Sequence, residues 1–130
     1  MGSSFKKYNT VRDFQDSTHV LKLVYPGVGD TGETLTIRSQ YSKEFREAKA
    51  RATRQITTMT IARKGKDLTD DEVKLIEDTQ FASLIAGWSF EEECTVENII
   101  EFLDANPQVY DLINTTAAQD TLFLKKPAKK

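Results

Sequence analysis

Two short stretches in the first third of the chain alternate between apolar and polar positions. Residues 18–25 (THVLKLVY) are rich in β-branched and aromatic side chains, and residues 33–39 (ETLTIRS) repeat the alternation. Both patterns indicate strands, and the glycine-rich residues 26–32 between them are typical of a loop. The sequence therefore predicts an antiparallel β-hairpin. The side chains expected on its apolar face are Leu21, Leu23, Tyr25, Leu35 and Ile37.

Helical spacing of apolar positions begins after the hairpin. Ser42 is a good N-cap, and the helix that it opens is expected to end near Arg63, before Gly65. A hairpin on its own is marginally stable in water, so another element must pack on its apolar face. We expect this basic helix to cover that face. Its apolar positions are Phe45, Ala48, Ala52, Ile56 and Met59.

The second half of the chain is expected to be helical. Thr69 and Glu72 form a capping box at the start of a helix that extends to Gly87-Trp88. Thr95 is the N-cap of the next helix, and Asn106–Pro107 opens the third, with proline at the first helical position. A block of three helices thus follows the hairpin and its covering helix. The side chains expected to anchor the core of this block are Phe81, Leu84, Trp88, Ile99 and Leu103.

Irregular segments flank these elements. Residues 1–17 are polar with isolated aromatics, which predicts an irregular arm, with one short strand at most, whose aromatics dock on the core or on a neighbouring molecule. Residues 125–130 (KKPAKK) lack a large apolar side chain, so a flexible basic tail is expected. The predicted fold class is α+β, with an N-terminal hairpin of two or three strands. Its expected divisions are a hairpin and helix subdomain (1–66), an acidic helical subdomain (67–124) and the tail.

Charge is segregated along the chain, although the net formal charge is only −2. Residues 42–66 contain eight Lys and Arg against two acidic residues, whereas residues 67–104 contain twelve Asp and Glu against Lys74. These segments either pack near each other within one molecule, or join copies head to tail, or steer a charged partner. The side chains that we expect to bind a partner protein are Arg46, Lys49, Arg54, Glu91, Glu92, Glu93, Phe123, Lys125 and Lys126.

Candidate chemistry is sparse. His19 and Cys94 are the only residues of their types, whereas a zinc site requires three or four ligands. Cys94 also follows three glutamates, and adjacent negative charge disfavours its reactive thiolate. The glycines in residues 26–32 precede a strand, so they do not form a phosphate-binding loop. We therefore expect no catalytic, metal or cofactor site, and a protein that is not an enzyme.

Composition narrows the location and the class of partner. A single cysteine excludes an internal disulfide, and the chain lacks an apolar run of the length that a membrane span requires. Both observations favour the cytoplasm. The basic residues 42–66 lack the aromatic platform of a nucleic-acid binder and are followed by twelve acidic residues. Protein binding is thus favoured over nucleic-acid binding.

Four short motifs in the second half occur in a recognisable order. Residues 79–88 (TQFASLIAGW) end in Gly-Trp and are followed by an acidic stretch, and residues 95–103 read TVENIIEFL. Residues 106–113 (NPQVYDLI) begin a proline-initiated helix, and residues 122–126 (LFLKK) end in a phenylalanine followed by lysines. In this order the motifs resemble phage tail assembly chaperones. The acidic connection between the first two is shorter than is usual in that family.

The resemblance implies a role in building the tails of long-tailed phages. Members of this family bind the tape measure protein, keep it soluble and help recruit tail tube subunits, without entering the virion. The same function is expected here, in the host cytoplasm, from a chain that forms a homo-oligomer. The family commonly makes an extended product by ribosomal frameshifting, for which the lysine codons at 125–126 and 129–130 are candidates. The alternatives are a virion structural subunit (a head–tail connector or tail-completion protein) and a nucleic-acid-binding regulator.

Overall fold

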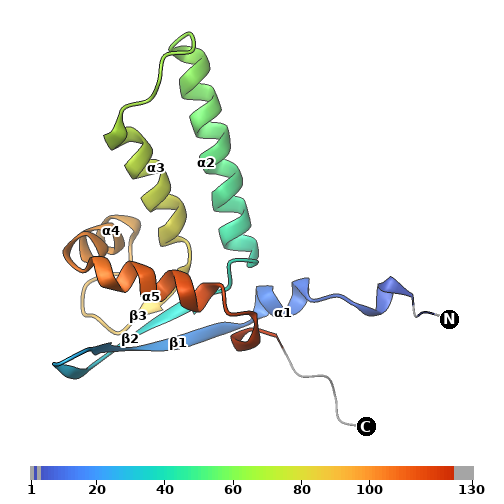
Figure 1. Cartoon of the computed structure of the whole chain (residues 1–130), viewed down its shortest axis with the longest axis vertical. Coiled ribbons are helices and arrows are strands. Elements are labelled where there is room, and N and C mark those ends of the chain that lie inside the picture. The colour runs from blue at the N-terminus through green and yellow to red at the C-terminus, as the bar shows by residue number, and fades with distance from the viewer. Residues whose placement is uncertain (1, 3, 125–130) are drawn as a thin grey trace.

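An antiparallel sheet forms the base of the molecule (Figure 1). The computed structural model describes residues 2 and 4–124, and within these residues the sheet has three strands in the order β1-β2-β3. The strands are β1 (Thr18–Tyr25), β2 (Gly29–Arg38) and β3 (Ile85–Trp88). Helices from the second half of the chain cover one face of this sheet, and two helices project from it as an arm (Figure 1). The predicted α+β class is confirmed.

The hairpin of β1 and β2 follows the sequence prediction, except that its loop is shorter. Leu21 lies opposite Leu35, so the predicted apolar side chains share one face. The strand β2 begins at Gly29 rather than at residue 33, and Val28 N–H donates to the Tyr25 carbonyl at 2.9 Å to close the turn. Gly29 has φ 108°, a left-handed value that a side chain would oppose. Glycine therefore lets the strands pair further into the expected loop.

The third strand corrects the prediction for Gly87-Trp88. The helix α3 (Asp70–Ala82) ends before this motif, and Ile85–Trp88 pairs with β2 instead of continuing the helix. Leu35 lies opposite Trp88, and Arg38 N–H donates to the Leu84 carbonyl at 2.7 Å. Pairing satisfies backbone groups along β2 that would otherwise form a free edge, and this tertiary gain outweighs the helical spacing of the sequence. The third strand comes from this segment and not from the N-terminal residues.

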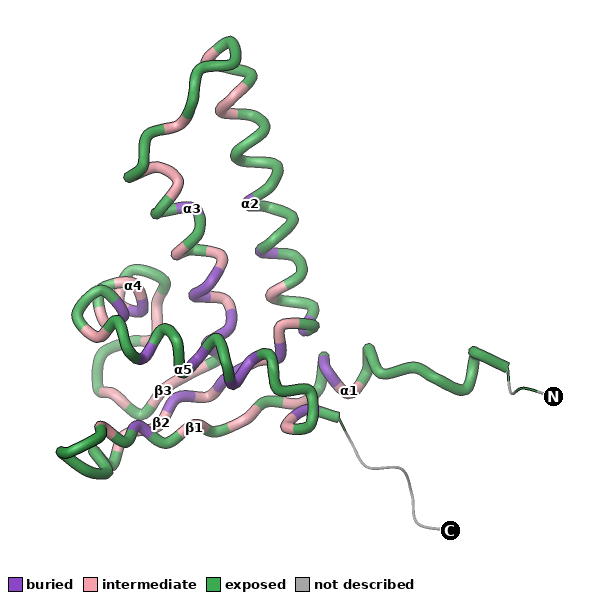
Figure 2. The backbone as a smooth tube through the Cα atoms, viewed as in Figure 1, coloured by how far each residue is buried: buried purple, intermediate pink, exposed green. Residues whose placement is uncertain are grey.

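The helices α3, α4 (Val96–Ala105) and α5 (Pro107–Ala117) share one core with the sheet. The buried segments lie where these helices meet the strands (Figure 2). The N-caps predicted at Thr69 and Thr95 and the proline at the start of α5 are confirmed. The residues of this core are Leu23, Leu35, Ile37, Phe81, Ala82, Leu84, Ile85, Ile99, Leu103, Val109, Ile113 and Ala117.

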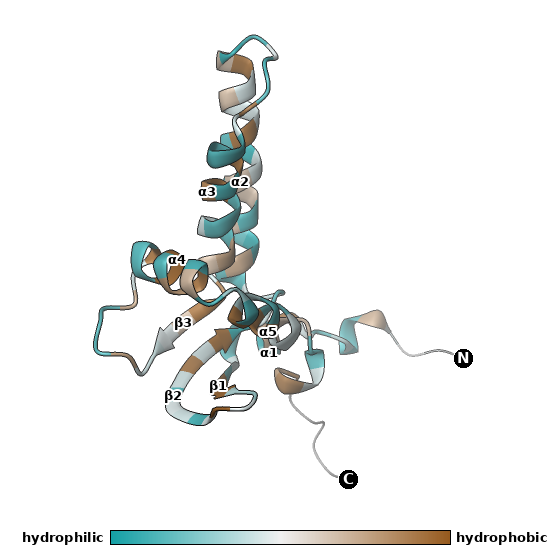
Figure 3. Cartoon of the chain, turned by 60° about the vertical axis from the view of Figure 1, so that its left-hand side comes forward, coloured by the Kyte–Doolittle hydropathy of each residue, from teal (hydrophilic) through white to brown (hydrophobic). Residues whose placement is uncertain are grey.

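The basic helix α2 (Lys43–Ala62) was predicted to cover the hairpin, but it does not. It packs along α3, and the two helices form an arm that stands away from the sheet (Figure 3). Its N-cap is Ser42, as predicted, but its buried residues are Ala48 and Ala52, which are too small to fill the space above a sheet. The bulkier side chains of α3, α4 and α5 take that place.

An ion pair and a capping box close the tip of the arm. The Arg63 guanidinium binds both carboxylate oxygens of Glu72 across the turn between α2 and α3. Glu72 also accepts hydrogen bonds from Thr69, whose backbone N–H lies 2.9 Å from Oε1. Because of the Arg63 hydrogen bonds first and the Thr69 bond second, the pKa of Glu72 falls from 4.5 to about 2.

The two ends of the chain differ from expectation. Residues 4–17 contain a 3₁₀ turn at Phe5–Lys7 and the short helix α1 (Val11–Asp16), with no strand among them. Phe14 is buried, but Phe5 is 80% exposed. Phe123, predicted to be an exposed contact, is 1% exposed, because the 3₁₀ turn η2 (Asp120–Leu122) directs its ring into the protein. The expected basic tail, with Lys125 and Lys126, lies outside the described residues.

Truncation of Phe123 is expected to destabilise the fold. The change Phe123→Ala removes a fully buried ring and leaves a cavity, for which about 3–5 kcal/mol is expected. Urea denaturation followed by circular dichroism measures the loss. The matched control is Phe5→Ala at an exposed position, with an expected change within about 0.5 kcal/mol. Equal effects of the two changes would contradict the burial of Phe123.

Stability should depend on pH through Glu72. Its pKa is lower in the folded state than the ordinary 4.5, so its contribution is present above about pH 4.5 and is lost as the pH falls toward about 2. The variant Glu72→Gln should therefore be less stable than the original chain at about pH 6, and this difference should shrink at about pH 2.5. Urea midpoints at both pH values measure it. Glu77→Gln, at an exposed position, is the control, and a gap that does not shrink contradicts the prediction.

Candidate functional site

An apolar pocket lies between the helix α1 and residues 120–124 near the end of the chain. It has a volume of about 490 Å³, and its walls come from α1, from the connection between β2 and α2, and from η2. Val11 and Tyr41, both about half exposed, are accessible at this pocket. The lining residues are Thr10, Val11, Phe14, Tyr41, Arg46, Asp120 and Leu124. A pocket with apolar walls and a few polar groups is suited to bind apolar side chains of a partner.

Buried side chains hold the walls of this pocket in place. Phe14 is buried and its ring packs against Tyr41, with ring centroids 5.0 Å apart. Leu124 N–H donates to the Asp120 carbonyl at 2.9 Å, next to the buried Phe123. Phe123, which precedes Leu124 in the chain, is therefore not the exposed contact that the sequence predicted.

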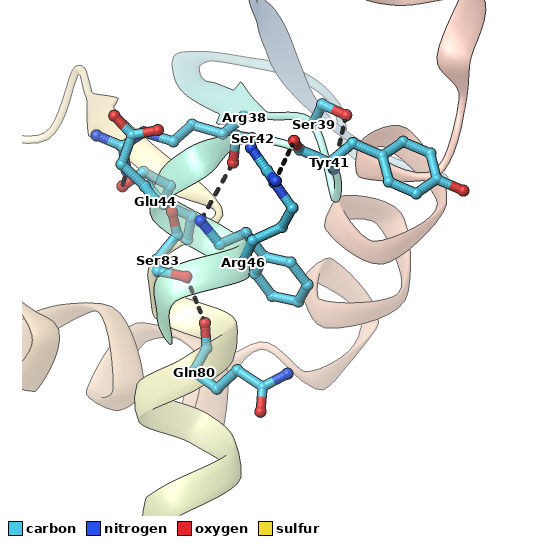
Figure 4. Close-up of polar contacts among 10 residues, drawn as sticks. Arg38, Ser39, Tyr41, Ser42, Glu44, Arg46, Gln80 and Ser83 are labelled. Carbon is cyan, nitrogen blue, oxygen red and sulfur yellow. Dashed lines mark hydrogen bonds and ion pairs between the residues drawn. The ribbon is translucent and has the colours of Figure 1, made fainter. Parts of the chain in front are cut away.

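Arg46, one of the predicted binding residues, lies at this pocket. Its Nε donates to the Tyr41 carbonyl at 3.1 Å, and Tyr41 N–H in turn donates to Ser39 Oγ at 3.0 Å (Figure 4). These bonds fix the segment between β2 and α2. The Arg46 guanidinium therefore supplies a positive charge at the rim of an apolar surface.

Arg38 joins the segment between β2 and α2 to β3. The alternating sequence pattern did not indicate this role. The Arg38 guanidinium donates to the Ser83 carbonyl at 2.9 Å and lies 3.9 Å from a Glu44 carboxylate oxygen (Figure 4). The side chain thus connects β2, the end of α3 and the first turn of α2. Such a contact between distant segments is visible only in the folded chain.

A second hollow surrounds Trp88 and is aromatic and acidic. The Trp88 ring meets Phe90 and Phe102 edge-on, with centroids 5.1 and 5.9 Å away, and its Nε1 donates to the Glu92 carbonyl at 2.8 Å. Trp88 is half-buried against the core, while Phe81, Leu84, Ile99 and Leu103 are buried in it. The hollow has a volume of about 330 Å³. Its lining residues are Trp88, Phe90, Glu92, Asn98, Glu101, Phe102, Ala105 and Asn106.

The predicted binding residues do not form one site. Lys49 and Arg54 are exposed along α2, away from the apolar pocket, whereas residues 91–93 are exposed beside Trp88. Among the residues that the structure describes, none of these side chains takes part in an ion pair. The apolar pocket was missed because its walls come from residues 10–14, 41–46 and 120–124, which share no sequence pattern.

Cys94 is the described residue with a free thiol. Burial raises the pKa of the Cys94 thiol, since the thiolate is less well solvated there, and the charge of Arg38 opposes this only in part. Within residues 2 and 4–124, no group of three or more His, Cys, Asp and Glu side chains is placed to hold a metal ion. In the same part of the chain, every helix is too short or too polar to cross a membrane.

Comparison with known proteins identifies the family. A family model described as phage tail assembly chaperone matches residues 13–122, from α1 to η2. Searches of curated proteins and of solved structures gave no significant match. The matched segment contains the sheet, the arm and the core, and it confirms the resemblance seen in the sequence motifs. The chain therefore belongs to the phage tail assembly chaperone family.

Proposed function

We propose that this chaperone binds the tape measure protein of a long-tailed phage, keeps it soluble and helps recruit tail tube subunits around it. The observation that carries the proposal is the family match over residues 13–122, together with the order of the motifs in residues 79–126. It is a binding function, and it requires exposed surface that an elongated apolar partner can occupy before assembly.

The apolar pocket at α1 is the proposed site for the tape measure protein. We expect a tape measure to be a long helical chain with an apolar stripe, which presents side chains at i, i+3, i+4 and i+7. The rings of Phe14 and Tyr41 provide a wall for such side chains, and Leu124 extends it. The charged groups of Arg46 and Asp120 at the pocket orient the polar flank of the helix.

The N-terminal residues offer a further exposed apolar surface. Phe5 and Tyr8 are 80% and 76% exposed, and their segment leads away from α1 (Figure 1). Two exposed aromatic rings that precede α1 in the chain support a role in holding a partner of variable sequence, because such rings make large contacts without strict geometry. Both would lose water on binding and so favour association.

Co-expression tests the proposed function directly. The chain should increase the soluble fraction of the tape measure protein of the same phage, and the two proteins should co-purify. The chain should also be absent from purified virions by mass spectrometry, as is expected of an assembly factor and not of a structural subunit. Unchanged solubility without a complex, or stoichiometric presence in the virion, would refute the proposal.

A point substitution tests the pocket. Val11→Glu places a charge in the apolar pocket and should weaken binding of the tape measure protein about tenfold or more, because the carboxylate must lose water on contact. Val28→Glu, in the exposed turn between β1 and β2, is the matched control and should bind as the original chain does. Pull-down at graded concentrations compares the two. Equal binding by both variants would place the site elsewhere.

A further inference from the structure

Two surfaces of opposite charge face away from each other on this chain. The first is the outer face of α2, opposite the buried Ala48 and Ala52, and it is called here the basic face. Apart from Glu47, its charged side chains are cations, and all of them are exposed. The cations on and beside this face are Lys43, Arg46, Lys49, Arg51 and Arg54.

The basic face also has a recess lined by two arginines and by Glu47. Ala50 is small, and the hollow above it is bounded by Glu47, Arg51 and Arg54. Two guanidinium groups around one recess offer several N–H donors in a planar arrangement that suits carboxylate oxygens. Within the described residues neither Arg51 nor Arg54 has an ion-pair partner, so both remain free to bind one.

The second surface is the hollow around Trp88, called here the acidic aromatic groove. Its rings are those of Trp88, Phe90 and Phe102, and the carboxylates of Glu92 and Glu101 stand among its lining residues. Neither carboxylate has an ion-pair partner in residues 2 and 4–124. Aromatic faces bordered by carboxylates are suited to bind an arginine side chain, by cation–π contact and by hydrogen bonds together.

The two surfaces cannot neutralise each other within one molecule. The helix α3 packs against α2 on one side and against α4 on the other, so it stands between the basic face and the groove (Figure 1). The ion pairs of α3 and α4 join Lys74 to Asp78 and Asp104, at 2.6 and 2.9 Å, and Glu72 to Arg63 at the end of α2, so none of them uses the cations of the basic face. Of the arrangements that the charge pattern allowed, packing of the two segments within one chain does occur, since α2 lies along α3 and Arg63 pairs with Glu72. Among the described residues this packing leaves the cations of the basic face and the carboxylates of the groove without ion-pair partners.

We infer that the basic face of one copy binds the acidic aromatic groove of a second copy, with Arg51 and Arg54 placed against Trp88, Glu92 and Glu101. A second copy is the occupant that accounts for both unpaired surfaces by one contact. A nucleic acid would use the basic face but leave the groove empty, and the groove's carboxylates would repel it. Arg46 belongs to both the basic face and the apolar pocket, but Arg51 and Arg54, which make the inferred contact, do not line that pocket, and the inference does not depend on the proposed function.

The inferred contact is heterologous, since it joins different patches on the two copies. Each dimer would retain a free basic face at one end and a free groove at the other. Addition of further copies therefore continues until a ring closes or an open chain forms. Because the contact is charged and exposed, its strength should fall as salt screens it.

Reciprocal charge reversal tests this interface in the purified full chain. Variant A carries Glu92→Lys and Glu101→Lys, and variant B carries Arg51→Glu and Arg54→Glu. Variant A has two positive surfaces and variant B two negative ones, so each alone should lose self-association, with dissociation constants raised about tenfold or more. An equimolar mixture of A and B has complementary surfaces at every contact and should assemble again. Sedimentation velocity at about 50 mM and about 500 mM salt measures all three samples.

Controls separate the interface from folding and from total charge. Lys22→Glu with Arg12→Glu changes the net charge as variant B does, at exposed positions away from both surfaces, and should associate as the original chain does. Thermal unfolding checks that all variants are folded. Trp88 is the single tryptophan, so its emission should shift on association and return on dilution or in high salt. A chain that stays monomeric at low salt, variants that associate alone, or a mixture that fails to assemble would each overturn the inference.

Discussion

The pairing of β3 with β2 is the interaction on which the other features of this chain depend. β2 runs through the middle of the sheet, and without Ile85–Trp88 its second edge would expose unpaired backbone groups. Because residues 85–88 pair with β2, α3 ends at Ala82 and the chain enters the sheet. The helices α4 and α5 that follow then share their core with the strands. The pairing also turns the Trp88 ring toward Phe102 of α4, which creates the aromatic groove.

The arm of α2 and α3 follows from the same constraint. Because α4, α5 and the C-terminal end of α3 pack on the apolar face of the sheet, α2 reaches this core only with Phe45 and otherwise packs along α3. A helix with alanines as its buried residues can do this at close range, while the rest of its circumference stays in water. The arm thus displays the cations of α2 on its outer side, and α3 stands between them and the acidic residues that precede α4.

The surfaces suggested for partners use different physical forces. The apolar pocket at α1 would gain from removal of water, which is insensitive to salt at ordinary concentrations and has little directional preference. The basic face and the acidic aromatic groove would act through charge, which is directional and is screened by salt. A family member that holds an apolar client and also contacts its own copies could therefore do both at once, since Arg51 and Arg54 of the inferred contact do not line the pocket.

The sequence by itself determined the local structure. Alternation set both strands of the hairpin, and Ser42, Thr69, Thr95 and Pro107 set the starts of four helices, because capping and pleating depend on neighbours in the chain. The motifs of residues 79–126 also indicated the family, which the match over residues 13–122 confirmed.

Tertiary structure alone decided the rest. Residues 85–88 have the spacing of a helix but pair as a strand, because β2 offers them hydrogen bonds that the sequence cannot reveal. Phe123 lies near the end of the chain but is buried, since burial depends on the cavity that the other elements leave. The apolar pocket joins segments more than 70 residues apart, and the head-to-tail contact that the charge pattern allowed acquired defined surfaces only once α3 was seen to stand between them. Contacts between distant segments leave no periodicity in a single sequence, and the candidate sites of this protein consist of such contacts.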